Sequence, residues 1–148
     1  MSKFLLIPFL AVFCAAALFA GKAPDNWETD FDTAKKKAEK LGVPVVVLFS
    51  GTDWCPPCKM LRKRVLDDKK FGRALKDKCI LLYVDVPRKY DPDFARDMQT
   101  KYSFVDLRGV PTTIITDSKI SHIKKRIRPA SIKDFVDGVK AASQTTAE

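Results

Sequence analysis

The sequence predicts an α/β fold in which helices flank both faces of a mixed central sheet. Two observations predict this class: apolar residues recur alternately at helical and at strand spacing, and two short apolar runs have the pattern of strands buried on both faces. The resulting element order, αβαβαββα, is typical of one α/β domain. The chain has 148 residues, of which 46% are hydrophobic, which suits a single globular domain and excludes a disordered protein.

The first elements of this domain are predicted from periodicity and from the residues that begin and end a helix. Apolar residues at helical spacing predict a helix over residues 30–41, with Thr29 or Asp30 as its cap and Gly42 at its end. Residues 45–49 are β-branched, aromatic or leucine throughout, as expected of a strand that is covered on both faces.

The later elements follow from the same signals. An apolar stripe predicts a helix over residues 56–68, whose two leading prolines are tolerated in a first turn. The other predicted elements are a strand over residues 79–84, a helix over 92–102, a hairpin with strands over 112–116 and 120–127, and a final helix capped by Ser131.

The first 20 residues are predicted to be a secretory signal peptide. An uncharged apolar run follows Lys3 and ends in a cluster of alanines, where cleavage after Ala17 or Ala20 is expected. The alternative is an uncleaved anchor, because the run has 17 residues, the lower limit for a spanning helix. We therefore expect a periplasmic or otherwise secreted protein. Its predicted parts are the signal peptide 1–20, a linker 21–27, a domain over 28–143 and a polar tail 144–148.

The cysteines indicate the chemistry. If Cys14 leaves with the signal peptide, Cys55, Cys58 and Cys79 enter an oxidising compartment. Cys55 and Cys58 form a Cys-X-X-Cys pair between a predicted buried strand and a predicted helix. A sulfur at a helix N-terminus is stabilised as the thiolate, the nucleophile of disulfide exchange. We expect Cys55, as the more exposed cysteine, to attack a substrate disulfide, and Cys58 to resolve the mixed disulfide.

Other uses of the two cysteines are less well supported. A structural zinc site needs four ligands, and only Cys79, expected in a buried strand, and His122, expected on a solvated hairpin, remain. Haem attachment needs a histidine where Lys59 stands. A purely structural disulfide is the simplest alternative. A Cu(I) carrier with His122 as a further ligand is the alternative from another functional class. We assign no metal ligand and no bound cofactor.

After the predicted leader, nearly the whole chain resembles the thioredoxin-like family. The resemblance rests on residues 54–59 (Trp-Cys-Pro-Pro-Cys-Lys), on residues 108–112 (Arg-Gly-Val-Pro-Thr) and on the element order. Residues 50–53 resemble the secreted bacterial branch, which includes the periplasmic DsbH-type oxidoreductases. The resemblance implies a thioredoxin-like fold and a cis Val110–Pro111 bond facing the disulfide. The expected substrate-binding residues are Trp54, Pro56, Pro57, Val110 and Pro111.

Two departures from the family bear on the direction of electron flow. Thioredoxin has a buried acid beneath the cysteines, but residues 46–49 are apolar, and only Asp53 or Asp85 could act in its place through water. Strongly oxidising relatives have a histidine between the cysteines, which this chain lacks. We therefore expect a reductant of protein disulfides, with a disulfide-forming oxidase as the alternative.

The expected partners follow from this function. They are protein or peptide disulfides and, by resemblance, a membrane-embedded electron donor, and the protein is expected to be a monomer. A nucleic-acid interpretation is suggested by four basic residues close together in the chain, Lys124, Lys125, Arg126 and Arg128. Export argues against it, and the basic residues at 35–37 and 124–128 are expected to be solvated surface, the latter protecting an edge strand.

Overall fold

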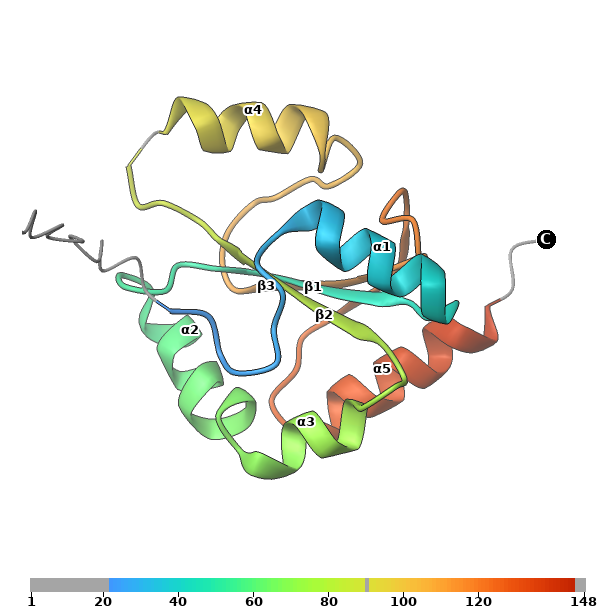
Figure 1. The fold of residues 1–148 in the computed structure, drawn as a ribbon. Coiled ribbons are helices and arrows are strands. Elements are labelled where there is room, and N and C mark those ends of the chain that lie inside the picture. The colour runs from blue at the N-terminus through green and yellow to red at the C-terminus, as the bar shows by residue number, and fades with distance from the viewer. Residues whose placement is uncertain (1–21, 90, 146–148) are drawn as a thin grey trace, which may run out of the picture.

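The computed structural model describes residues 22–89 and 91–145 (Figure 1). The predicted signal peptide, 1–20, and residues 146–148 of the predicted tail lie outside the described residues. In the part of the chain that is described, no helix is both long enough and apolar enough to cross a membrane.

The centre of the fold is a mixed sheet with the strand order β2-β1-β3-β4. β1 pairs in parallel with β2 and antiparallel with β3, and β3 pairs antiparallel with β4. Every residue of β1 is buried, which confirms the prediction of a strand covered on both faces. The strands are β1 (Val45–Ser50), β2 (Ile80–Asp85), β3 (Thr112–Thr116) and β4 (Ile123–Ile127).

Helices cover both faces of the sheet, as predicted. Figure 1 shows α1 and α4 on one face, and α2, α3 and α5 on the other. The helices are α1 (Phe31–Leu41), α2 (Pro56–Leu61), α3 (Lys69–Leu75), α4 (Pro92–Thr100) and α5 (Ile132–Gln144), and the π-helical turn η1 (Arg62–Leu66) follows α2.

The predicted helix caps are confirmed. The Asp30 carboxylate accepts a hydrogen bond from the Thr33 amide at the start of α1, at 2.8 Å. Gly42 ends α1 with a φ of 64°, a left-handed conformation that glycine adopts without steric cost. Ser131 begins α5 in a capping box with Asp134.

Two predicted elements differ from the structure. The predicted helix over residues 56–68 divides into α2 and η1, and a further helix, α3, follows. Asp68 begins α3 by accepting a hydrogen bond from the Lys70 amide at 2.8 Å, so the chain starts a new helix there. The second hairpin strand was predicted from residue 120, but it begins at Ile123, because Ile120 has a φ of 54° and lies in the turn.

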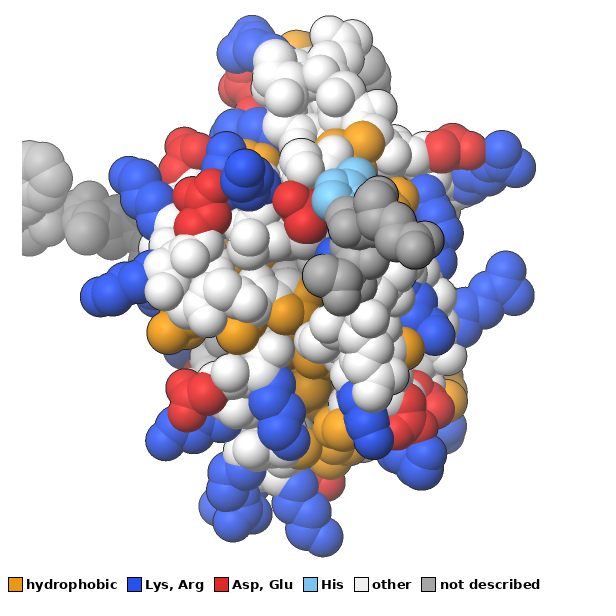
Figure 2. Space-filling model, turned by 90° about the vertical axis from the view of Figure 1, so that its right-hand side faces the viewer, with side chains coloured by type: hydrophobic (Ala, Val, Ile, Leu, Met, Phe, Trp, Pro, Cys, Tyr) orange, Lys and Arg blue, Asp and Glu red, His pale blue; other side chains and the backbone are white. Residues whose placement is uncertain are grey.

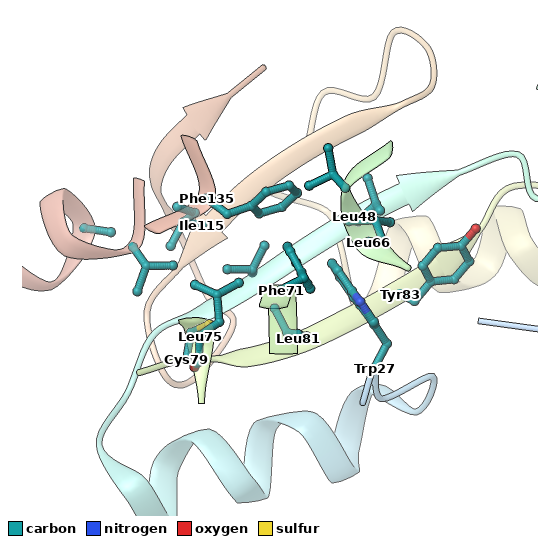
Figure 3. Packing of buried hydrophobic residues seen from close by; sticks show 14 residues of the cluster. Trp27, Leu48, Leu66, Phe71, Leu75, Cys79, Leu81, Tyr83, Ile115 and Phe135 are labelled. Atoms are coloured by element: carbon teal, nitrogen blue, oxygen red, sulfur yellow. The ribbon is translucent and has the colours of Figure 1, made fainter. Parts of the chain in front are cut away.

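The core beneath α3 and α5 includes a residue of the predicted linker. Trp27 stacks on Phe71, with ring centroids 6.0 Å apart, and meets Tyr83 edge-on (Figure 3). The next residue, Glu28, forms a parallel bridge to Leu82 beside β2. Trp27, the last residue of the predicted linker, therefore packs into the core of the domain.

Candidate active site

The two cysteines of the motif lie where β1 passes into α2. Cys55 is the N-cap residue of α2, and it forms a disulfide with Cys58, with the two Cα atoms 5.3 Å apart. The sequence predicted that Cys55 would be the more exposed cysteine, which is wrong: each residue is only 3% exposed. Cys55 is covered because the Val110 peptide packs against it, with the carbonyl oxygen 3.7 Å from Sγ.

One backbone amide at the start of α2 is directed at the sulfur of Cys55. The Cys58 N–H donates a hydrogen bond to Cys55 Sγ at 3.3 Å. Pro56 and Pro57 occupy the first two positions of α2 and have no N–H, so the Cys58 amide is the first one in the helix that can donate. The helical chain continues without interruption from α2 into η1.

The cysteine sulfurs have no acidic hydrogen-bond partner among the described residues. β1 is apolar and buried up to Phe49, and Asp53 is exposed. The Asp85 carboxylate instead accepts hydrogen bonds from the amide and the hydroxyl of Thr52, at 3.0 and 2.6 Å. Asp85 therefore holds the loop before the cysteines in place.

A polar network that the sequence analysis did not identify supports this loop. The Thr52 hydroxyl lies 2.8 Å from the Tyr83 hydroxyl in addition to its bond with Asp85. The sequence alone could not show this network, because it depends on the parallel pairing of β1 and β2, in which Ser50 pairs with Asp85. Their carboxyl ends therefore meet at one edge of the sheet, next to the motif.

Trp54 is held in place by a hydrogen bond from its indole nitrogen and by close contact of its ring with Gly51. Its Nε1 donates a hydrogen bond to the Val86 carbonyl oxygen at 2.8 Å. The indole also lies over Gly51, where a Cβ would come within 2.5 Å of the ring. Trp54 nevertheless remains 36% exposed, so it offers an apolar surface next to Cys55.

The structure brings the expected substrate-binding residues together around the disulfide. The Val110–Pro111 peptide bond is cis and lies immediately before β3. Val110 and Pro111 are half-buried, whereas Pro56 and Pro57 are exposed. Residues from three parts of the chain, 54–58, 86 and 110–111, therefore meet at one surface.

Cys79 and His122, the other two candidate metal ligands, do not reach this surface. Cys79 is buried just before β2, and burial raises the pKa of its thiol to about 12, which makes it unreactive at neutral pH. His122 is exposed and follows the far end of β3, so the strand alone separates it from Pro111 by about 14 Å. Within the described ranges, no group of three or more His, Cys, Asp or Glu residues could hold a metal ion.

Comparison with known proteins places most of the chain in one family. A family model described as thioredoxin-like matches residues 26–118. A curated relative, the thioredoxin-related protein DsbJ of Chlamydia pneumoniae, is 34% identical over 59 residues. That match spans 40% of this chain and only 17% of the length of the relative.

Solved structures show the same fold. A structure titled DsbH oxidoreductase matches with a TM-score of 0.66 and 21% identity, over 85% of this chain and 89% of that chain. The reduced C-terminal domain of DsbD from Neisseria meningitidis matches with a TM-score of 0.56 and 18% identity, over 74% and 90% of the two chains. At these identities the structural likeness establishes the fold.

Proposed function

The chain belongs to the thioredoxin-like family, and we propose that it is an exported thiol:disulfide oxidoreductase that reduces protein disulfides with Cys55 and Cys58. The observation that supports this most directly is the position of the pair. The two cysteines are within disulfide-bond distance at the start of α2, and the cis Val110–Pro111 segment lies against Cys55.

In the proposed reaction the reduced protein transfers two electrons to its substrate. The Cys55 thiolate attacks one sulfur of a substrate disulfide, that bond breaks, and the other substrate sulfur leaves and takes up a proton. Cys58 then gives up its proton and attacks Cys55 Sγ. The Cys55–Cys58 disulfide forms, and the second substrate thiol is released. The residues of this chain position the sulfurs and need no bound cofactor for these steps.

The surface around the disulfide suits an extended polypeptide. Trp54 and Met60 are two of the three large hydrophobic side chains that are strongly exposed in the described chain, and they come directly before and just after the cysteines. We propose that Trp54, Pro56, Pro57, Val110 and Pro111 form the binding surface for the substrate.

The surroundings of the sulfurs support a reducing role. A disulfide-forming oxidase such as DsbA is a strong oxidant because its reduced form is stabilised. Here the Cys58 amide is the hydrogen-bond donor that the structure provides to Cys55 Sγ, and two prolines precede it. With weak stabilisation of the thiolate, the dithiol gives up its electrons readily. A membrane-embedded dithiol protein is the proposed donor that restores the reduced state, and residues 1–20 are the proposed export signal.

Trapping of mixed disulfides tests the proposed reaction. With Cys58→Ala, Cys55 should accumulate mixed disulfides with a reducible protein such as insulin, because no second thiol can release the substrate. Cys55→Ala is the matched control and should trap nothing. If Cys58→Ala forms no adduct and the wild-type pair instead binds Cu(I) tightly, the carrier function replaces the one proposed.

The reduction potential of the pair tests the direction. Equilibration with glutathione should give a value near that of thioredoxin, about −270 mV. A value near that of DsbA, about −120 mV, would make the protein a disulfide-forming oxidase.

A further inference from the structure

A groove beside the disulfide has features that the proposed reaction does not use. It has a volume of about 400 Å³, and Pro57 of the cysteine motif and cis Pro111 both line it. Its apolar lining includes Met60, Leu61 and Ile127, of which Met60 is 50% exposed. A polypeptide whose disulfide reaches Cys55 therefore has this groove directly alongside.

The charge at this groove has one sign. Arg64 and Arg128 line it, and no acidic residue does. Both arginines are exposed, and neither makes an ion pair or a side-chain hydrogen bond with any residue in the described part of the chain. Arg62 lies in η1 like Arg64, but it forms an ion pair with Asp67 at 3.3 Å. The two groove arginines are thus available to an external anion.

We propose that Arg64 and Arg128 make this groove selective for substrate segments that combine an apolar side chain with aspartate or glutamate near the attacked cysteine. The apolar lining buries the first side chain, and the guanidinium groups donate bidentate hydrogen bonds to the carboxylate. The inference rests on the proposed function, and it adds the class of substrate. A second copy of the chain is a poor occupant, because its net charge of +9 would meet two further positive charges.

The test compares symmetrical disulfide dimers of one short peptide. The peptide has leucine next to its cysteine and, two positions further on, glutamate, glutamine or lysine. Liquid chromatography measures the rate at which the reduced protein releases each peptide thiol. The rate for each dimer is divided by the rate at which dithiothreitol reduces the same dimer. Because dithiothreitol has no groove, this ratio removes the effect of the neighbouring charge on the reactivity of the peptide sulfur itself.

We expect the glutamate dimer to react about fivefold faster than the glutamine dimer, equivalent to about 1 kcal/mol, and the lysine dimer to react more slowly than both. Arg64→Gln with Arg128→Gln should reduce the ratio of glutamate to glutamine rates to about 1, because the ion pairs are lost. A denaturant titration that matches the wild type verifies that this variant is folded.

The matched control is Lys63→Gln with Arg126→Gln. It removes the same charge from exposed neighbouring positions that do not line the groove, and it should keep the wild-type ratio. Equal normalised rates for the three dimers, or an equal loss of preference in both double variants, would overturn the selectivity while leaving the proposed function intact. If the wild-type protein reduces none of the dimers faster than the Cys55→Ala variant does, the proposed function fails as well.

Discussion

Gly51 is the residue on which the position of Trp54 depends most directly. The indole ring lies so close to its Cα that an added Cβ would be 2.5 Å from Cε2 and 2.8 Å from Nε1. The same Nε1 donates the hydrogen bond to the Val86 carbonyl oxygen. Any side chain at residue 51 therefore competes with the contact that holds Trp54 beside Cys55.

We expect Gly51→Ala to displace the indole and to break its hydrogen bond with Val86. Overpacking of this kind lowers the free energy of unfolding by about 1–3 kcal/mol. Denaturant titration measures this loss, and tryptophan fluorescence should shift as the Trp54 ring moves. Gly109→Ala is the control, since a Cβ there meets no atom within 4 Å, and it should change stability by less than about 0.5 kcal/mol. A Gly51→Ala protein as stable as the wild type would contradict the steric argument.

The turn between β3 and β4 is organised by the carboxylate of Asp117. It accepts hydrogen bonds from the Ser121 amide at 2.7 Å, the Ser121 hydroxyl at 2.9 Å and the His122 amide at 3.2 Å. Partial burial acts to raise the pKa of Asp117, but these hydrogen bonds together outweigh it and leave the pKa below its ordinary value. The turn thus depends on the ionised carboxylate.

This dependence predicts a pH-sensitive stability difference for Asp117→Asn. We expect the variant to lose about 1–2 kcal/mol of unfolding free energy at neutral pH, because a neutral amide oxygen is a weaker acceptor. A carboxyl group with a lowered pKa in the folded state stabilises the protein above its unfolded pKa, about 3.9, and stops doing so as pH falls through the folded value. Denaturant titrations from pH 7 to pH 3 should therefore show the wild type and the variant converging.

The control for the Asp117→Asn prediction is Asp106→Asn. Asp106 pairs with Arg108, but their side chains are 65% and 87% exposed, so the pair should contribute less than about 0.5 kcal/mol at any pH. A difference between the wild type and Asp117→Asn that stays constant across the pH range would mean that the lost interaction does not depend on ionisation.

The redox state of the Cys55–Cys58 pair is linked to the stability of the whole protein. If the folded environment favours the Cys55–Cys58 disulfide over the dithiol, as a reductant requires, the oxidised protein must be more stable than the reduced one. We expect the oxidised form to unfold at a higher denaturant concentration. The two forms of the wild type can be compared directly, and Cys55→Ala should show no dependence on reductant. A more stable reduced form would indicate an oxidase.

The positively charged side chains of the molecule are not gathered in one patch on the face that Figure 2 displays. Figure 2 shows lysine and arginine side chains spread around the outline of the displayed face, with acidic side chains among them. Several of the basic residues elsewhere in the chain are engaged locally, such as Lys124, which donates to the carbonyl oxygens of Ala142 and Thr145 at the end of α5. Arg64 and Arg128 differ because they have no such partner among the described residues and share an apolar groove.

The elements with a strong local signal were predicted well. The buried strand β1, the capped helices α1 and α5 and the cysteine motif before α2 all agree with the structure. Helix α3 was missed because its segment is polar and contains Gly72, so its periodicity is weak. Phe71 and Leu75 stabilise it by packing into the core, a tertiary contribution that local propensity does not include.

The sequence by itself therefore determined the fold class, the helix caps and the position of the cysteine pair at the start of a helix, because each depends on residues that are close together in the chain. Only the tertiary structure decided that Cys55 is buried beneath Val110, that Asp85 holds Thr52, and which arginines line the groove beside the cysteine motif. These contacts join residues more than 30 positions apart, and their geometry depends on how the strands pair and how the helices pack on them.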